Sequence, residues 1–500
     1  MQNEEQVPET EKVSENDQIA QRLAHLETLK EKGLDPYLAV FLDPQTVEAV
    51  RQEFEKDQQS INVRLAGRVM AIREHGKATF ADLWGKTDKI QLYFKQDIVG
   101  EDQYAAMKTM DLGDMLGVEG EVFLTHKGEL SVKVEKFSFL SKSLFPMPEK
   151  WHGLKDPELR FRARYLDLII NPEVRKNFQL RSRIVSYIRN FLDAKGFMEV
   201  ETPSMGPICG GATARPFLTH HNALDLDLKL RIATELHLKR LIVGGLERVY
   251  EIGRVFRNEG ISIRHNPEFT MLELYQAYSD YQGMMDLAEA MIASLCKEVL
   301  GNYRLIFDEK ELDLTPPYAR LKFDAALQKF GGISLADLRD PQKGEKIAEK
   351  LGIELQRENL GYLIDKVFSV VVEPNLFAPT FIIDYPVEIS PLAKKQAGNP
   401  LLTDRFELFI RNFEVANAFS ELNDPFDQEE RFKGQLELSQ KGDEEAHPYD
   451  EDFIQALKYG MPPTGGMGIG IDRLVMVLTG QISIREVILF PLLRPEKSEE

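Results

Sequence analysis

The chain has little cysteine and no long apolar run. Its 500 residues include two cysteines, Cys209 and Cys296, whose spacing matches no metal-binding or redox motif, so a reducing compartment is favoured over a secreted, disulfide-stabilised protein. No apolar run approaches the roughly 20 residues that a membrane helix needs. The acidic, polar start differs from the basic and then apolar start of a signal peptide. We therefore expect a cytoplasmic protein with no membrane partner.

Positive charge is also scarce. The sequence has 62 lysines and arginines against 81 aspartates and glutamates, a net charge of −19. A field of this sign repels phosphates, which excludes indiscriminate binding to nucleic acid, so any such contact must come from a local basic patch. The hydrophobic content of 43% is ample for two or three domains.

The first part of the chain predicts a tail and a helix. Residues 1–16 contain almost no large apolar side chains and predict a mobile acidic tail. Residues 17–33 predict a helix that begins at Asp17 as its N-cap and ends before Gly33. Its expected apolar stripe consists of Ile19, Leu23, Leu26 and Leu29.

Two domains follow from the pattern of strands and breaks. Between residues 63 and 144, five strand-like runs separated by glycines, with a helical interruption near 101–110, predict a small closed barrel of the OB kind. We assign 17–148 to this domain, because the proline-containing stretch after it marks a boundary. Residues 149–500 alternate strand hairpins with helices, which predicts an α+β fold, with a helical insertion near 320–372.

A hairpin predicted over residues 247–278 carries more charge than a connector needs. Read with a period of two, Leu272 and Leu274 face the core, and the opposite face of the same strand turns toward a cleft. The alternative is a solvated hairpin held by weak surface ion pairs. The residues of the cleft face and of the loop are Phe269, Met271, Glu273, Tyr275, Arg257, Arg264 and His265.

A second charged hairpin covers residues 405–424. Glu407 and Glu414 lie on its neighbouring strands, and a divalent cation such as Mg²⁺ would relieve the repulsion between them. The alternative is a solvent-facing strand. Asn417, Phe419 and Glu421 share one face, whereas Glu414 has the opposite parity. A β-bulge between Glu414 and Asn417 is therefore predicted if all of them serve one cleft.

A glycine-rich stretch, MPPTGGMGIGIDRLVMVLTG, precedes a helix predicted to start near Ile471. We interpret its glycines as a flexible approach to that helix. Arg473 falls in the first turn, where a bound anion would gain from both the arginine and the helix dipole. The stretch matches neither the P-loop nor the dinucleotide-binding glycine pattern.

Taken together, these motifs resemble those of a class II aminoacyl-tRNA synthetase. The loop RVFRNEG…RHNPEFTMLE resembles motif 2 of that class, GIGIDRL resembles motif 3, and GFMEVETP resembles motif 1. The segments RIATELHLKRLIVGG, YPVEISPLAKK, ANAFSELNDP and PPTGGMGIGIDR resemble lysyl-tRNA synthetases in particular. The resemblance implies a catalytic domain built on an antiparallel sheet with flanking helices.

The resemblance also implies an activity: lysine is activated with ATP and then transferred to the terminal ribose of its tRNA. It implies a homodimer formed through the helix before Pro203, and Mg²⁺ held by Glu407 and Glu414. Catalytic roles fall on Arg257 and Arg473. The implied ATP-binding residues are Arg257, Glu259, Arg264, His265, Phe269, Glu407 and Arg473. The implied lysine-binding residues are Gly211, Glu235, Glu273, Tyr275, Asn417, Phe419 and Glu421.

In the barrel, the resemblance assigns anticodon reading to Arg73, Phe80 and Gln91. Seven basic side chains and several aromatic ones on the first three strands fit this role, although basic residues on a barrel are often only a solvated face. The sequence departs from the family at Leu83 to Gly85, which read LWG in place of LQD. The basic residues are Arg64, Arg68, Arg73, Lys77, Lys86, Lys89 and Lys95.

Two other readings compete. One is a related enzyme, either an aspartate or asparagine synthetase or a ligase that attaches lysine to a protein. Glu273 and Glu421 argue against the former, and the complete barrel argues against the latter. The other is an inactive paralogue that only binds, which should have lost phosphate and metal ligands that this chain retains.

Overall fold

The computed structural model describes residues 14–86, 88–148, 154, 156–307, 309–355, 359–440 and 447–495. Residues 1–13 of the predicted tail (1–16) and part of the predicted boundary stretch lie outside this range, whereas Glu15 and Asn16 of that tail belong to a helix. The chain forms two compact units, Met1–Pro157 with Tyr165–Lys176, and Glu158–Arg164 with Asn177–Glu500. Within the described residues, no helix is long and apolar enough to cross a membrane.

The first helix, α1 (Glu15–Glu31), starts earlier than predicted. Its N-cap is Ser14, whose hydroxyl accepts a hydrogen bond from the backbone of Asp17 and donates one to the Asp17 carboxylate, so Asp17 belongs to the first turn. Leu26 and Leu29 are buried as expected, but Leu23 is exposed and Arg22 takes the buried position instead. The helix ends before Gly33, which has a positive φ.

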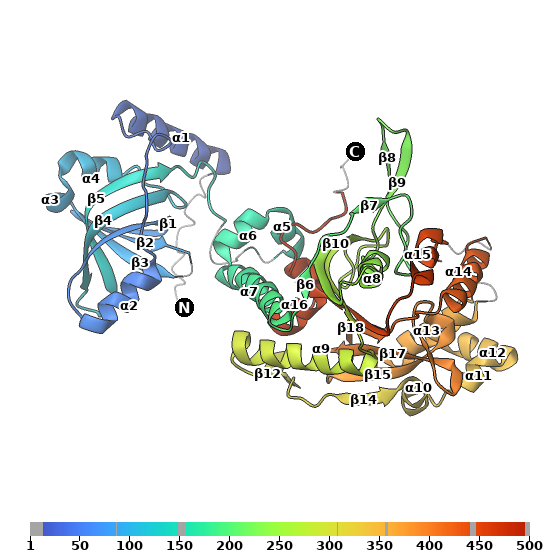
Figure 1. Ribbon diagram of the computed structural model, residues 1–500. Coiled ribbons are helices and arrows are strands. Elements are labelled where there is room, and N and C mark those ends of the chain that lie inside the picture. Colours follow the sequence, from blue (N-terminus) through green and yellow to red (C-terminus); the bar gives the residue numbers. More distant parts are fainter. Residues whose placement is uncertain are drawn as a thin grey trace, which may run out of the picture. The chain divides into compact units, whose positions relative to one another are not determined.

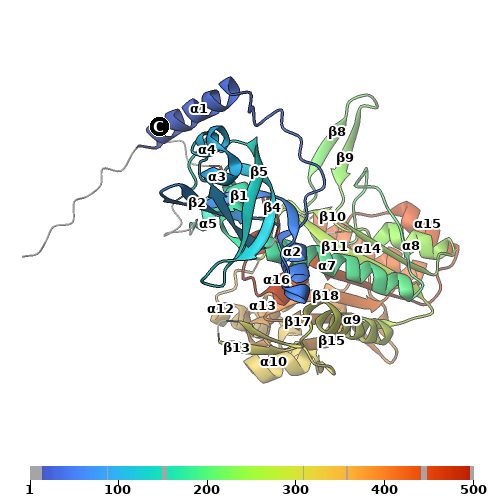
Figure 2. The same ribbon diagram turned by 90° about the vertical axis from the view of Figure 1, so that its left-hand side faces the viewer.

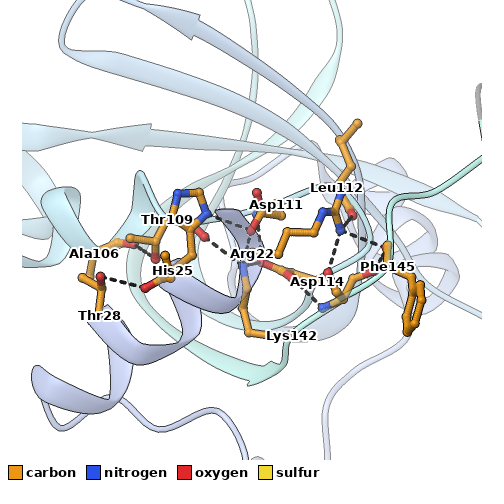
Figure 3. A network of polar contacts seen from close by, with 12 residues as sticks. Arg22, His25, Thr28, Ala106, Thr109, Asp111, Leu112, Asp114, Lys142 and Phe145 are labelled. Carbon is orange, nitrogen blue, oxygen red and sulfur yellow. Dashed lines mark hydrogen bonds and ion pairs between the residues drawn. The ribbon is translucent and has the colours of Figure 1, made fainter. Parts of the chain in front are cut away.

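Arg22 and its neighbours anchor α1 through polar contacts (Figure 3). The Arg22 guanidinium donates to the carbonyls of Leu112, Ser143 and Phe145 at 3.0, 2.6 and 3.1 Å. His25 Nδ1 lies 2.9 Å from the Asp111 carboxylate. These contacts hold the helix to the end of the barrel by saturating main-chain carbonyls that would otherwise lose their water.

The predicted closed barrel is confirmed, with strand order β1-β2-β3-β5-β4. In both views α1 and α2 flank the barrel (Figures 1 and 2). Its apolar interior includes Leu65, Leu92, Phe94 and Val118, all fully buried. The strands are β1 (Asn62–His75), β2 (Ala78–Trp84), β3 (Lys89–Lys95), β4 (Met115–Leu124) and β5 (Leu130–Ser141), and the helices are α2 (Val47–Asp57), α3 (Gln96–Val99) and α4 (Glu101–Met107).

The second unit is built on a nine-stranded, mainly antiparallel sheet. The strand order is β14-β15-β17-β18-β19-β11-β10-β6, with β16 paired to β17. The predicted hairpins are its central strands. The bounds are β6 (Met198–Glu199), β10 (Arg248–Phe256), β11 (Glu268–Ala277), β14 (Ala319–Lys322), β15 (Thr380–Pro386), β16 (Lys395–Gln396), β17 (Asn399–Ile410), β18 (Phe413–Ser420) and β19 (Thr464–Gly470).

One face of this sheet packs into the main core. Leu272 and Leu274 point into it, as their parity predicts, together with Met467 and Ile469 of β19. Three amphipathic helices cover this face: α7 (Pro172–Ala194), α9 (Tyr281–Leu295) and α16 (Ile471–Thr479). The opposite face therefore remains available for a site.

Two groups of helices flank the opposite face. Tyr275 packs with α8 (Glu235–Val243), α14 (Pro425–Gln440) and α15 (Glu451–Lys458). The other group packs against β15 and β17 and consists of α10 (Phe323–Gly331), α11 (Leu335–Arg339), α12 (Pro341–Leu351) and α13 (Leu360–Val371).

The remaining elements are short. Strands β7 (Met205–Gly206), β8 (Leu218–His221) and β9 (Leu226–Leu230) form a small sheet whose hairpin projects from the second unit (Figures 1 and 2). Strands β12 (Arg304–Phe307) and β13 (Lys310–Asp313) pair with each other. The other helical elements are α5 (Pro157–Arg162), α6 (Arg164–Ile170), η1 (Cys296–Leu300), η2 (Glu373–Asn375), η3 (Val387–Ile389) and η4 (Ile484–Glu486).

Candidate active site

A row of polar side chains crosses the open face of the sheet at one level. The pairings run from Glu251 to Glu273, Gly468, Asn417 and Glu407, through β10, β11, β19, β18 and β17. Residues paired across neighbouring strands point to the same face. The register thus brings together residues that were predicted from two separate hairpins.

The predicted bulge is confirmed. Leu408 pairs with Ala416 and Phe409 with Glu414, so Val415 is the extra residue on β18. This insertion lies between Glu414 and Asn417. It switches the parity of the strand, so Glu414 shares the face of Asn417 although the two residues are three positions apart.

The glycine-rich stretch is not a flexible approach, as the sequence suggested, but the buried central strand β19. Its glycines make room for side chains of the site. A Cβ atom on Gly466 would lie 2.5 Å from Tyr275 Cε1 and would also collide with Glu421 Oε1. One on Gly468 would lie 2.6 Å from Met271 Cε. A strand without side chains lets groups from its neighbours meet above it.

Three carboxylates and one ammonium group line the deepest part of the site. Lys239 on α8 is fully buried, and its Nζ donates to Glu235 Oε1 at 2.5 Å and pairs with Glu421 Oε2. Glu421 Oε1 has no hydrogen-bond partner. Gly211 packs against this group, since a Cβ there would lie 3.1 Å from Glu235 Cβ. Its φ of +96° suits glycine.

Glu273 is the third carboxylate of this group. Its Oε1 accepts a hydrogen bond from the Thr234 backbone at 3.0 Å, and the Tyr275 hydroxyl lies 3.4 Å from its Oε2. Burial, together with the charge of Glu235, raises the pKa of Glu273 to about 7. A cation placed here would stabilise the ionised form.

Five of the side chains predicted to bind ATP lie in the loop between β10 and β11 or on β11 itself, while Glu407 lies on β17 and Arg473 on α16. The Arg257 guanidinium lies 5.2 Å from the centre of the Phe269 ring. Burial lowers the pKa of Arg257, and the negative charge of Glu259 opposes this shift. Arg264 lies 5.1 Å from the Phe413 ring. His265 Nδ1 forms a hydrogen bond with Ser262 Oγ at 3.0 Å. Burial and the charge of Arg473 lower the pKa of His265.

Arg473 lies in the first turn of α16, as predicted. Its Nη1 donates to the Glu414 carbonyl and carboxylate, both at 3.0 Å. The preceding residue, Asp472, is buried and accepts from Arg181 Nη1 and from the Thr270 backbone at 2.6 Å each. Asp472 therefore fixes the start of α16 against β11 and α7.

Glu407 and Glu414 show the repulsion expected of two neighbouring carboxylates. Burial and the charge of Glu414 raise the pKa of Glu407 to about 7. Glu407 also accepts from Tyr385 at 2.8 Å and from Arg405 at 2.5 Å. No group of three or more histidine, cysteine, aspartate or glutamate side chains in the described ranges is arranged to hold a metal ion.

The residues predicted to read the anticodon share one face of the barrel in the first unit. Arg73 pairs with Phe80 across β1 and β2, Phe80 pairs with Tyr93 on β3, and Gln91 lies two residues before Tyr93. The Phe80 and Tyr93 rings are 5.0 Å apart. Gln91 contacts Glu129 at 3.1 Å and Ser131 at 3.0 Å.

Sequence reasoning missed Lys239 and Arg405. Arg405 donates to Asn417 Oδ1 at 3.1 Å, in addition to Glu407, and so orients both. A signal was present for each: Glu235 and Lys239 are four residues apart on a helix, and Arg405 and Glu407 share strand parity. Neither spacing reveals that the charges are buried.

The fold and the site together define a class of protein. Residues 156–494 match the family "tRNA synthetases class II (D, K and N)", and residues 63–140 match the "OB-fold nucleic acid binding domain". The chain belongs to the class II tRNA synthetases of this group.

Individual relatives are more specific. The chain is 57% identical to the lysine–tRNA ligase of Moorella thermoacetica over 97% of this chain and 99% of that protein. It is 56% identical to the lysine–tRNA ligase of Carboxydothermus hydrogenoformans, over 96% and 98%. The lysine–tRNA ligase of Listeria monocytogenes is 49% identical over 96% and 98%.

Proposed function

We propose that this chain is a ligase that joins lysine to its tRNA. In the first step the lysine carboxylate attacks the α-phosphate of ATP, and pyrophosphate leaves. In the second step a terminal ribose hydroxyl of the tRNA attacks the carbonyl of lysyl-adenylate, and AMP leaves. The identity to lysine–tRNA ligases over nearly the whole chain supports this assignment. The observation that carries it is the buried group of Glu235, Glu273 and Glu421, which suits a substrate with two ammonium groups.

The lysine site lies where β11, β18 and α8 meet. Glu235 and the backbone at Gly211 receive the α-ammonium group, and Glu421, Glu273 and Tyr275 surround the side-chain ammonium. Acceptors at fixed positions in a desolvated pocket reject neutral side chains, because such a side chain would leave a buried carboxylate unpaired. The remaining lining residues are Asn417 and Phe419.

ATP binds between the motif 2 hairpin and the start of α16. Phe269 stacks on the adenine ring, while Glu259, Arg264 and His265 contact the nucleotide. Arg257 neutralises charge that develops on the α-phosphate, and Arg473 holds the pyrophosphate that leaves. Arginine suits both places because its planar fork meets phosphate oxygens in pairs and stays charged.

Mg²⁺ fits the carboxylate pair of Glu407 and Glu414. Their mutual repulsion, which raises the pKa of Glu407, is relieved by a divalent cation, and Mg²⁺ commonly takes one or two carboxylates plus substrate phosphates. When bound, the ion offsets phosphate charge. Arg405 and Tyr385 hold Glu407 in place, and Arg473 holds Glu414.

The barrel reads the anticodon through Arg73, Phe80 and Gln91. Phe80 offers a ring for base stacking, and the amide of Gln91 offers hydrogen bonds to base edges. Two chains form a homodimer through α7 and the edge strand β6, where Met198 is exposed. We place the protein in the cytoplasm, where its tRNA substrate is found. Light scattering that shows only monomers contradicts the dimer.

The test of the function is ATP–pyrophosphate exchange, run with each of the twenty amino acids and without tRNA. We expect exchange with lysine alone, abolished by EDTA and restored by Mg²⁺. Exchange with aspartate or asparagine instead would keep the family and overturn the lysine site. Absence of exchange with every amino acid would overturn the enzymatic function.

A further inference from the structure

Lys239 lies among the carboxylates of the lysine pocket and carries the same charge as the ammonium groups of the ligand. It is fully buried on α8, and its ammonium lies between carboxylates from two different elements, Glu235 at the start of the same helix and Glu421 just after β18. The Phe419 and Phe453 rings lie 5.4 and 5.9 Å from its Nζ. Rings at this distance attract the ammonium group, but its burial remains costly unless the carboxylates beside it are ionised.

The charge balance of the pocket suggests what Lys239 does. Three buried carboxylates face one ammonium group, while Arg405 is already paired with Glu407. When all three carboxylates are ionised, Lys239 therefore offsets only part of their negative charge. A free lysine molecule brings two ammonium groups, one on its α-carbon and one on its side chain, and its carboxylate is the reacting group. Without Lys239, three carboxylates would face two cations.

The hydrogen bonds lead to the same conclusion. Lys239 engages one oxygen of Glu235 and one of Glu421, so each carboxylate keeps its second oxygen. Glu421 Oε1 is buried without a hydrogen-bond partner and lies against Gly466 at the sheet surface. An unpartnered, buried carboxylate oxygen in a native fold is costly, and an ammonium group of the ligand would remove this cost.

We propose that Lys239 is a positioning and specificity residue of the lysine site: it cancels one of three buried carboxylates and aims the other oxygens of Glu235 and Glu421 at the two ammonium groups of the substrate. This inference rests on the proposed function. Burial raises the pKa of Glu235 and of Glu421, and the Lys239 ammonium opposes that rise in both. Lys239 thereby favours the ionised form of both acceptors before lysine arrives.

The surroundings of Lys239 contain other titratable groups. Glu273 on β11 faces Glu421, and Tyr275 lies beside Glu273 on β11. His447, before α15, is buried with Nδ1 unpartnered, and burial and the charge of Lys239 lower its pKa to about 4. His447 is therefore neutral near pH 7, and the carboxylates alone set the pH dependence of lysine binding there.

The first experiment compares Lys239→Met with the wild-type protein in ATP–pyrophosphate exchange between pH 6 and 9. We expect the KM for lysine to rise about tenfold or more, as when one partner of a buried charge pair is removed, while the KM for ATP changes little. We also expect the pH below which lysine KM rises to move upward, because the carboxylates lose their opposing cation. Lys458→Met, an exposed lysine on α15, is the matched control and should behave as wild type.

The second experiment measures the number of protons released when lysine binds. Lysine is titrated into the protein by calorimetry at pH 8, in buffers of different ionisation enthalpy. The wild-type protein should release almost no proton on binding lysine, whereas Lys239→Met should release close to one. Lys239→Gln serves as a second variant if the methionine variant does not fold, and circular dichroism checks both.

Unchanged lysine KM, pH profile and proton release in these variants would overturn the role of Lys239. Equal losses for lysine and ATP with an unchanged pH profile would show a structural role only, and would overturn it too. The proposed function fails differently: the wild-type protein itself would then show no lysine-dependent exchange.

Discussion

A buried lysine between two carboxylates occurs in each unit of the molecule, and the two arrangements differ in how completely they are satisfied. Lys142 in the first unit donates to Asp111 and Asp114 at 2.6 Å each and to the Thr109 carbonyl at 2.8 Å (Figure 3). Lys239 in the second unit pairs with Glu235 and Glu421.

The carboxylates make the difference. Asp114 also accepts from the backbones of Asp111 and Ser143, at 2.8 Å each, and Asp111 accepts from His25. Burial raises the pKa of Asp114 despite these bonds, whereas Lys142 and His25 outweigh burial at Asp111 and lower its pKa. Glu421 keeps a buried oxygen without a partner, and its pKa is raised. A saturated network stabilises a fold, whereas an unsaturated one is suited to a ligand.

The largest expected effect is on the saturated network. Lys142→Met leaves the buried Asp114 and the half-buried Asp111 without their cation, so it should lower the free energy of unfolding of the first unit by about 3–5 kcal/mol. Urea unfolding followed by circular dichroism measures this. Lysine-dependent exchange by the second unit should remain. A loss no larger than that of the exposed control Lys30→Met would contradict the structural role of the network.

The next largest effect concerns Arg257, the cation proposed to contact the α-phosphate of ATP. Arg257→Ala should lower the rate of adenylate formation by about 10²–10³-fold, because it removes a preorganised cation from the developing charge of the transition state. Single-turnover exchange measures the rate, and calorimetry should show lysine binding nearly unchanged. Equal losses in rate and in lysine affinity would refute the assigned role.

A third effect is a pH dependence of lysine affinity. The pKa of Glu273 is raised to about 7, so the carboxylate is ionised above this pH and protonated below it. Lysine binding favours the ionised form. Affinity should be level above pH 8 and fall by up to about tenfold per unit as the pH drops below 7. Glu273→Gln should bind more weakly and lose this pH dependence; a profile that survives the substitution would place the titrating group elsewhere.

The smallest effect is expected on the face of the barrel that carries the half-buried Phe80. Phe80→Ala should cost about 1–3 kcal/mol in binding of the tRNA anticodon, the usual range for one stacked base. Aminoacylation at limiting tRNA should slow by the corresponding factor, while exchange without tRNA stays unchanged. Val134→Ala could not separate tRNA binding from folding in this way, because Val134 is buried in the barrel core and its truncation destabilises the barrel itself. Full retention of tRNA charging by Phe80→Ala would remove Phe80 from the anticodon site.

Much of the site could be predicted from the sequence because strand parity is a local rule. The alternation along 268–277 correctly separated Leu272 and Leu274 from Glu273 and Tyr275. The same rule showed that Glu414 has the opposite parity to Asn417. The two can share a face only through a bulge, which the structure has at Val415. The position of Arg473 in the first turn of α16 was predicted from the start of a helix after the glycines.

Other features could not be predicted, because they depend on partners distant in the chain. The glycines of β19 suggested flexibility, but neighbours on both sides make this strand rigid and central. Leu23 was expected to be buried, but its neighbour Arg22 is buried instead, because three carbonyls of the barrel end receive its guanidinium.

The sequence alone therefore determined the two folds, the face of each central strand and the chemical types available to the site, since periodicity and motif spacing are properties of neighbouring residues. Only the tertiary structure decided which charges meet. Lys239 and Glu421 lie far apart in the chain, and α8 must pack against the end of β18 before their charges can pair. Burial then decides the energetics, because a charge removed from water has to find its counterpart within the fold.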